Sequence, residues 1–167
     1  MKIGVFGNTN NYPLMLVLGL RKLGHDTRLV VNRKEPLHRP ESKVPQLAAG
    51  YPYWILDCSD IPEEDFLAGT PRIHGVLDYL ANGAGGLLLN DLGPSLLDFC
   101  RLPAVALVTG SDLTSYADPA LTQMRQQGWS AEYLRTPSAK LWGRRYDEFV
   151  GRQRAGLRSA NAVSAPL

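Results

Sequence analysis

Short, almost purely apolar runs recur along this chain, each bounded by turn-forming residues and separated from the next by a stretch with helical periodicity. Strands that read as continuous apolar runs are covered on both faces, and strands that alternate with helices form parallel sheets. The expected strands are Lys2–Phe6, Thr27–Val31, Tyr53–Asp57, Gly86–Leu89, Ala104–Val108 and a brief sixth over Ala160–Ser164. We therefore expect an α/β fold, a doubly wound, mostly parallel Rossmann-like sheet of about six strands with helices on both faces.

Helical patterns fill the segments between these runs. The first helix is expected to begin at Pro13, with Asn11 as its cap, and to end at Gly24. Its residues leave little polar surface, so we expect it to be buried between the sheet and another layer. Further helices are expected from Thr70–Pro71 to Gly83, from Pro119 to Gln127 and from Ser138 to about Arg158. The last of these should pack through a stripe formed by Trp142, Tyr146, Phe149, Gln153 and Leu157.

Composition restricts the function classes. The chain has 167 residues, 44% of them hydrophobic, and a formal net charge of only +2, which fits one globular domain and argues against a nucleic acid partner. Cys58 and Cys100 lack CxxC or metal-ligand spacing, so we expect free structural thiols, no metal site and a cytoplasmic location. No run is long enough for a signal or membrane-spanning segment.

The expected sixth strand stops almost as soon as it starts, with no helix after it to cover the sheet. We therefore expect residues 1–167 to be a single Rossmann-like domain that forms the N-terminal half of a larger two-domain protein. The alternative is a complete small protein with an edge strand at its C-terminus.

The first turn, in the segment KIGVFGNTNNYP, carries one glycine of the dinucleotide-binding pattern GxGxxG, at Gly7. The acidic residue expected after the second strand is also missing, and no GxxxxGK[ST] motif is present, so NAD and P-loop sites are not expected. Asn8, Thr9, Asn10 and Asn11 instead follow the carboxyl end of a strand beside a helix N-terminus, where they suit a sugar or polyol. In the alternative interpretation they only form the turn and cap the helix.

Two further polar turns follow the fourth and fifth strands, and the carboxyl ends of parallel strands meet at one edge of the sheet, where ligands bind. The candidate binding residues are Gly7, Asn8, Thr9, Asn11, Asn90, Asp91, Thr109, Gly110, Ser111 and Asp112. Asp91 and Asp112 could instead cap the short helices that follow them.

Three segments carry a resemblance to a known family. KIGVFGNTNNYPLMLVLGLRKLGHDTRLVV contains a strand, a glycine turn and a helix ending in Leu-Gly-His; PAVALVTGSDLTSY contains a strand and a Gly-Ser-Asp turn; LRSANAVSAPL closes the chain. Together they resemble the N-terminal, acceptor-side domain of GT-B glycosyltransferases, particularly the retaining group 1 (family 4-like) enzymes that use nucleotide sugars. One departure is Thr109, which stands where many members have histidine and cannot act as a base. His25, His38 and His74 are expected to be surface or packing residues.

The resemblance implies that this domain binds a sugar or lipid-linked acceptor through the residues of the three turns. It also implies a missing C-terminal donor domain that holds the nucleotide sugar, so this domain should bind no cofactor and should be inactive alone. No catalytic residue is assigned.

Basic residues form two groups that could contact an acidic acceptor or the anionic inner face of a membrane. The first, Arg33, Lys34 and Arg39, lies in an expected loop, and the second, Arg144 and Arg145, lies on the last helix. For the helix, the alternative is a solvated face with no partner.

Two other functions remain open at this point. One is a free-standing Rossmann-like binding or scaffold subunit that needs a separate catalytic partner. The other is a small nucleotide- or NADP-dependent enzyme that uses Arg33 near a 2′-phosphate, which NADP binding would test.

Overall fold

The computed structural model describes residues 1–164, except for the side chains of Leu67 and Ser111; residues 165–167, which end the third resemblance segment, lie outside it. One sheet contains six parallel strands: β1 (Lys2–Phe6), β2 (Asp26–Val31), β3 (Ile55–Asp57), β4 (Gly86–Leu89), β5 (Ala104–Leu107) and β6 (Ala162–Ser164). Their order is β3-β2-β1-β4-β5-β6, so the direction of winding reverses between β1 and β4. The expected doubly wound α/β fold is confirmed.

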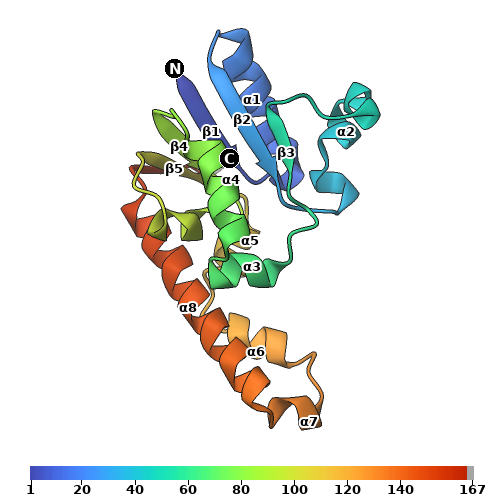
Figure 1. Cartoon of the computed structure of the whole chain (residues 1–167), viewed down its shortest axis with the longest axis vertical. Coiled ribbons are helices and arrows are strands. Elements are labelled where there is room, and N and C mark those ends of the chain that lie inside the picture. Colours follow the sequence, from blue (N-terminus) through green and yellow to red (C-terminus); the bar gives the residue numbers. More distant parts are fainter. Residues whose placement is uncertain (165–167) are drawn as a thin grey trace.

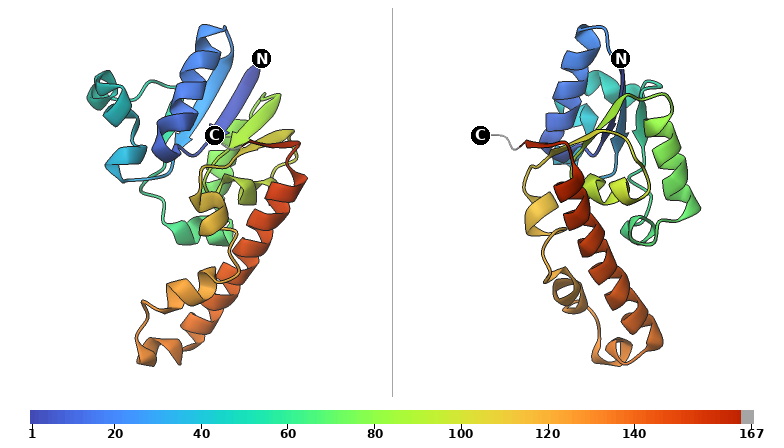
Figure 2. Two further views of the ribbon diagram at one scale, coloured as in Figure 1. Left: turned by 180° about the vertical axis from the view of Figure 1, so that it is seen from behind. Right: turned by 90° about the vertical axis from the view of Figure 1, so that its left-hand side faces the viewer.

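The helices lie on both faces of this sheet, as Figures 1 and 2 show. The α-helices are α1 (Tyr12–Lys22), α2 (Pro40–Lys43), α3 (Glu63–Ala68), α4 (Pro71–Ala81), α5 (Ser111–Thr114), α6 (Leu121–Gln126), α7 (Ala131–Leu134) and α8 (Pro137–Ser159). The 3-10 helices are η1 (Thr9–Asn11), η2 (Pro36–His38), η3 (Pro45–Ala49) and η4 (Gly93–Asp98). The three longer helices expected after Thr70, Pro119 and Ser138 correspond to α4, α6 and α8, whereas α3 was not expected.

Alternating strand residues build two separate cores. Phe6, Val30 and Leu89 pack with α4 and α8 on one face. On the other face, Val5 and Leu29 pack against α1. The register places Phe6 beside both Val30 and Leu89, so β1, β2 and β4 end together at the carboxyl edge of the sheet.

The expectation that α1 is buried between the sheet and another layer is wrong for the described residues. Leu14 and Val17 are fully buried, but Met15 is 49% exposed and Leu16 is 39% exposed. Only one side of α1 touches the sheet, and no other described element covers its outer side. Leu16 and Leu20 border an apolar groove of about 350 Å³ that continues over β4 and β5 to Val105.

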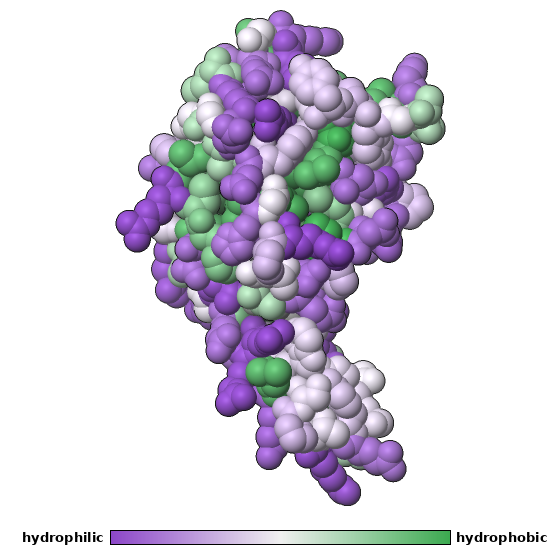
Figure 3. All heavy atoms as spheres, in the orientation of Figure 1, coloured by the Kyte–Doolittle hydropathy of each residue, from purple (hydrophilic) through white to green (hydrophobic). Residues whose placement is uncertain are grey.

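Three helices form a projection that extends past the carboxyl edge of the sheet. Figure 1 shows α6, α7 and the N-terminal half of α8 below the sheet. Figure 3 shows that the visible side of this projection combines hydrophilic residues with a broad area of intermediate hydropathy and one hydrophobic group. The expected packing stripe of α8 is confirmed at Tyr146, Phe149 and Gln153, which are all buried. Near its C-terminal end, α8 crosses η4 so closely that a Cβ on Gly156 would lie 1.8 Å from the carbonyl oxygen of Pro94.

Candidate functional site at the carboxyl edge of the sheet

The turn after β1 has an unusual backbone. Gly7 has a φ of 85°, and a Cβ there would lie 2.8 Å from the carbonyl oxygen of Asn90, so only glycine fits. Asn10 and Asn11 also have positive φ values, 55° and 60°. The left-handed conformation of Asn11 prevents the side-chain cap expected of it, and Asn8 acts instead: its Oδ1 accepts the N–H of Leu14 at 3.0 Å.

The two buried asparagines of this turn attach it to the loop after β2. The Nδ2 of Asn8 donates to Asn11 Oδ1 at 2.6 Å and to the carbonyl oxygen of His38 at 2.8 Å. The Nδ2 of Asn11 donates to the carbonyl oxygens of Leu37 and Arg39. Both side chains therefore hold the loop in place, and their polar atoms are already paired within the chain.

Asn90 connects the first turn to the turn after β5. Its Oδ1 accepts the N–H of Thr9 at 2.9 Å, and its Nδ2 donates to Thr109 Oγ1 at 2.8 Å. The same Nδ2 donates to the carbonyl oxygen of Leu107 at 2.7 Å. One amide therefore fixes the ends of β1, β4 and β5 relative to each other.

Asp112 completes this network. Its Oδ1 accepts the N–H groups of Thr109 at 2.9 Å and Gly110 at 2.8 Å, and its Oδ2 accepts the N–H of Asp91 at 3.1 Å. Burial raises the pKa of the Asp112 carboxyl, and these N–H groups offset part of that effect. The side chain stabilises two turns and is fully buried, so it faces no ligand directly.

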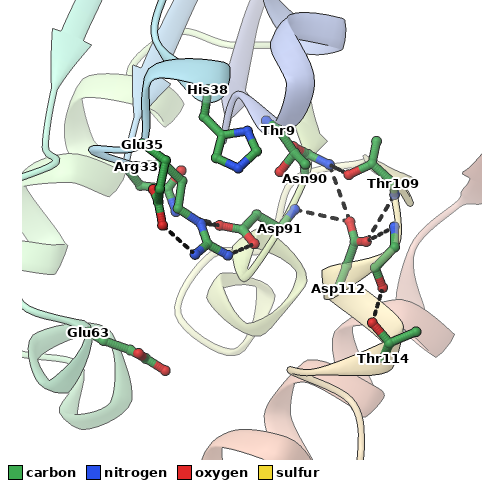
Figure 4. Close-up of polar contacts among 12 residues, drawn as sticks. Thr9, Arg33, Glu35, His38, Glu63, Asn90, Asp91, Thr109, Asp112 and Thr114 are labelled. Atoms are coloured by element: carbon green, nitrogen blue, oxygen red, sulfur yellow. Dashed lines mark hydrogen bonds and ion pairs between the residues drawn. The ribbon is translucent and has the colours of Figure 1, made fainter.

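Asp91 and Arg33 form the central ion pair of the site, shown in Figure 4. Nε of Arg33 donates to Asp91 Oδ2 at 2.8 Å and Nη2 donates to Oδ1 at 2.7 Å, while Asn32 Nδ2 donates to Oδ2 at 2.7 Å. Burial opposes the charge on Arg33, but Asp91 outweighs it and raises the pKa of the guanidinium. Asp91 adopts a φ of 61°, a conformation that costs a non-glycine residue energy and that clusters at functional sites.

Gln153 of α8 holds two of these turns from behind. Its Nε2 donates to the carbonyl oxygen of Asp91 at 2.8 Å and to that of Asp112 at 3.2 Å. Its Oε1 accepts the N–H of Ser95 at 3.0 Å. This fully buried side chain couples the long helix to the geometry of the edge.

A pocket of about 290 Å³ lies beside the ion pair, close to the lower end of the range for small-molecule sites, about 300 Å³. Asn32, Arg33, Glu35, Glu63, Phe66 and Tyr116 line much of it. The guanidinium of Arg33 lies 5.4 Å from the centre of the Tyr116 ring, so one wall combines a cation and an aromatic face.

Glu63 reaches the pocket from the first turn of α3 and pairs with the projection. Nη2 of Arg125, on α6, lies 2.8 Å from both carboxylate oxygens of Glu63. Burial raises the pKa of the Glu63 carboxyl, and Arg125 offsets this in part. Burial also raises the pKa of the Tyr116 phenol.

Two buried polar atoms of the site have no hydrogen-bond partner among the described residues: Oγ1 of Thr9 and Oδ1 of Asn32. Native proteins pair nearly all such atoms, so unpaired ones suggest bound water or a ligand.

The structure brings most of the predicted site residues together at this edge. The set comprises Gly7, Asn8, Thr9, Asn11, Asn90, Asp91, Thr109, Gly110, Asp112 and Arg33. Ser111 begins α5 at the same edge, and its side chain lies outside the described part. Lys34 lies nearby and pairs with Asp60 at 2.8 Å, whereas Arg39 pairs with Asp57 at 2.6 Å.

Arg144 and Arg145 lie apart from the edge, on the part of α8 within the projection. Sequence reasoning missed Asn32, Glu35, Glu63 and Tyr116, which line the pocket. Asn32 and Glu35 could have been found from their position in the loop after β2, whereas Glu63 on α3 and Tyr116 after α5 carry no such signal. Sequence reasoning expected His38 to be a surface or packing residue, and His38 packs against the first turn, where its Nδ1 accepts the N–H of Asn10. Within residues 1–164, no three His, Cys, Asp or Glu residues form a group that could hold a metal ion.

Comparison with known proteins gives limited similarity. The sequence matches no protein-family model and no curated protein. Among solved structures, apo UGT2 of Phytolacca americana, a UDP-glycosyltransferase, matches with a TM-score of 0.46 and 12% identity over 99% of this chain. The same protein complexed with UDP-2fluoro-glucose and pterostilbene matches with a TM-score of 0.45 and 13% identity. This chain spans 45% and 46% of those chains, less than half of either.

Proposed function

We propose that this chain is the acceptor-binding domain of a nucleotide-sugar-dependent glycosyltransferase. The observation that carries the proposal is the pocket beside Arg33 and Asp91, which combines carboxylates, an amide, a guanidinium and a phenol at the carboxyl edge of a doubly wound sheet. The resemblance of three sequence segments to the acceptor-side domain of GT-B enzymes supports it independently.

The chemistry of the pocket suits a hydroxyl-rich acceptor. The carboxylates of Glu35 and Glu63 can accept hydrogen bonds from hydroxyl groups, and Asn32 Oδ1 has no protein partner among the described residues. The buried ring of Tyr116 adds apolar surface to the pocket wall.

The charges near the pocket favour a neutral acceptor over an acidic one. Arg33 is paired with Asp91, Lys34 with Asp60 and Arg39 with Asp57, so each candidate cation already has a carboxylate partner. An acidic or phosphorylated acceptor would have to compete with these pairs. We therefore propose a neutral acceptor. The phosphorylated acceptors in the transfer assay described below test the acidic alternative.

In this proposal the nucleotide sugar is held by a second domain of the full-length protein, which would also supply the donor-side chemistry. Arg33 has two of its three nitrogen atoms on Asp91, which favours a structural and acceptor-positioning role over recognition of a 2′-phosphate. The domain alone is then expected to bind acceptor and to catalyse no transfer.

The decisive experiment compares the product of the complete natural reading frame with residues 1–167. Each is incubated with UDP- and GDP-sugars and a panel of neutral and phosphorylated sugar acceptors, and release of the nucleoside diphosphate is measured. The proposal predicts acceptor-dependent release by the full product only. If the full product loses this release when it carries Asp91→Asn, but keeps it with Asp78→Asn on α4, the carboxyl edge of the sheet is required for transfer. No release with any pair of substrates would leave the binding-subunit interpretation in its place.

Contact with an anionic membrane is a second, separable part of the proposal. Arg144 is exposed on α8, and the Arg145 guanidinium lies 4.8 Å from the centre of the Trp142 ring, so a cation and an aromatic group sit together on the projection. Among the described residues, no helix is both long enough and apolar enough to cross a bilayer. Sedimentation with phosphatidylglycerol vesicles should fall for the double variant Arg144→Gln, Arg145→Gln, and equal sedimentation would exclude this contact.

A further inference from the structure

We propose that Thr9 and His38 form a hydroxyl-binding pair, in which His38 Nε2 donates to the oxygen of an acceptor hydroxyl and Thr9 Oγ1 accepts its hydrogen. This inference rests on the acceptor-binding function proposed above, and it names two residues that contact the acceptor. It assigns His38 a recognition role that its loop position in the sequence does not suggest.

The imidazole of His38 is held at a defined position. Its Nδ1 accepts the backbone N–H of Asn10 at 2.9 Å. The carbonyl oxygen of the same histidine accepts Nδ2 of Asn8 at 2.8 Å. Asn10 has a left-handed backbone, with φ 55° and ψ 23°, which directs its N–H at the ring. Ring and backbone of His38 are therefore both bonded to the turn after β1.

This geometry fixes the tautomer. A ring nitrogen that accepts a hydrogen bond carries no proton, so the neutral imidazole must carry its hydrogen on Nε2. No described residue pairs with Nε2. The ring therefore offers one donor and no acceptor to a ligand, which makes it a recognition group and excludes it as a base at this position.

Thr9 supplies the complementary group. The residue is 6% exposed, and its backbone N–H is already bonded to Asn90 Oδ1. Its Oγ1 is buried without a partner among the described residues, although a hydroxyl can both donate and accept. A buried hydroxyl left unpaired in the free protein gains a hydrogen bond when a ligand hydroxyl arrives.

The two residues lie together at the first turn. Thr9 directly precedes Asn10, which holds the ring. Figure 4 shows the His38 ring directed toward the Arg33–Asp91 pair, with Thr9 next to Asn90. A donor from His38 and a hydroxyl from Thr9 suit a single O–H group that reaches both side chains. A neutral polyol provides such groups, and the Thr9 hydroxyl can accept from or donate to one of them.

Two measurements on residues 1–167 test the pair. Two-bond 1H–15N spectra of the imidazole report its tautomer, and saturation-transfer NMR reports binding of a panel of neutral monosaccharides and myo-inositol. We expect the Nε2–H tautomer in the free protein. An Nδ1–H tautomer of the neutral ring would overturn the inference.

Matched variants test recognition. His38→Gln keeps a donor near the position of Nε2 and His38→Phe removes it; Thr9→Ser keeps the hydroxyl and Thr9→Val removes it. His38→Phe and Thr9→Val should each weaken acceptor binding about tenfold, the effect of one lost hydrogen bond. His38→Gln and Thr9→Ser should each change the affinity by less than about threefold. His25→Phe, at the opposite end of the sheet, is the control and should have no effect.

The outcomes separate this inference from the function on which it rests. If the native chain binds a panel member and His38→Phe and Thr9→Val bind it equally well, the pair is overturned and the acceptor function stands. If the native chain binds none of the panel, the acceptor function fails and the pair's role fails with it. Thermal melts that match the native chain would show that a weakened variant is still folded.

Discussion

The guanidinium of Arg33 and the carboxylate of Asp91 meet in a two-point contact, 2.8 Å from Nε to Oδ2 and 2.7 Å from Nη2 to Oδ1. The two residues come from loops after β2 and β4, which lie on either side of β1. The Asp91 side chain is fully buried, whereas that of Arg33 is 24% exposed. Removal of the arginine would therefore leave a buried carboxylate without its main counter-charge.

Arg33→Met should lower the free energy of unfolding by about 3–5 kcal/mol, because breaking one side of a buried pair leaves the other charge desolvated. Arg33→Lys should lower the free energy of unfolding less than Arg33→Met does, because lysine keeps the positive charge although it cannot make the two-point contact. Urea unfolding measures both. Arg72→Met, which breaks a more exposed pair with Asp65 at 3.4 Å, should change stability by less than about 1 kcal/mol. Equal effects of Arg33→Met and Arg72→Met would contradict this account.

Two glycines of α8 should respond in opposite directions to alanine. Gly156→Ala places a Cβ 1.8 Å from the carbonyl oxygen of Pro94, so α8 and η4 must separate and the protein should lose several kcal/mol, roughly the range of severe overpacking. Gly151→Ala meets nothing within 4 Å and should gain up to about 1 kcal/mol from helix propensity. Thermal unfolding of the two variants is the test, and a stable Gly156→Ala protein would mean that the packing is looser than described.

Gln153→Leu should destabilise the protein by about 1–3 kcal/mol, because the carbonyl oxygens of Asp91 and Asp112 and the N–H of Ser95 lose their buried partner. Gln153→Glu should be worse, since a carboxylate would face two carbonyl oxygens. Gln123→Leu, exposed on α6, is the control and should remain within about 0.5 kcal/mol of the native chain. Hydrogen exchange should speed up at Ser95, and unchanged exchange there would argue against the coupling.

Acid should release the loop after β2. Burial alone would raise the pKa values of Asp57 and Glu41, but hydrogen bonds from Arg39 and Ser59 to Asp57, and from Tyr51 and Arg39 to Glu41, lower both. A lowered folded-state pKa adds stability that is present above the ordinary value, about 4, and is lost as the pH falls through the folded values.

The melting temperature of Asp57→Asn should therefore be lower than native near neutral pH, and the difference should shrink between about pH 5 and about pH 3. Glu63 and Asp112 act in the opposite sense, because burial raises their pKa values and acid favours their protonated forms. Since both proteins contain them, their effect cancels in the difference. A constant difference across this range would show that the Asp57 pair adds no pH-dependent stability.

The cysteines should differ in reactivity. Burial raises the pKa of the Cys58 thiol to about 12, whereas Cys100 is only partly buried. Because the thiolate is the reacting form, iodoacetamide at about pH 8 should modify Cys100 first, as peptide mass spectrometry would show. Faster labelling of Cys58 would indicate that the edge near β3 opens readily. Both thiols are free, as the sequence predicted.

The sheet could be predicted from the sequence because buried parallel strands are short apolar runs, and that pattern is local. The requirement for Gly7 and the meeting of three polar turns followed from the same logic. The roles of the individual turn residues could not be predicted, because the burial and hydrogen bonds of these residues depend on how the loops fold against one another. Asn11 was expected to cap α1, but its left-handed backbone gives that role to Asn8.

The pocket was beyond sequence reasoning for a related reason. Glu63 and Tyr116 are 53 positions apart, and they line one pocket only because α3 and the segment after α5 both lie beside the ion pair. On α1 the sequence predicted too much burial. The apolar residues on its outer side suggested a covering layer, and the structure leaves that side exposed.

The helical projection determines how stability measurements on this chain should be read. Met124 and Leu134 are exposed there, and Leu121 on α6 is buried against α8, so the projection has a smaller core than the sheet and should open at a lower free energy. Of the three tryptophans, Trp129 and Trp142 lie in or beside the projection, and only Trp54 packs near α1. Tryptophan emission would thus follow the opening of α6, α7 and the N-terminal half of α8 first, and a two-state fit to it would report a local transition as if it were global unfolding.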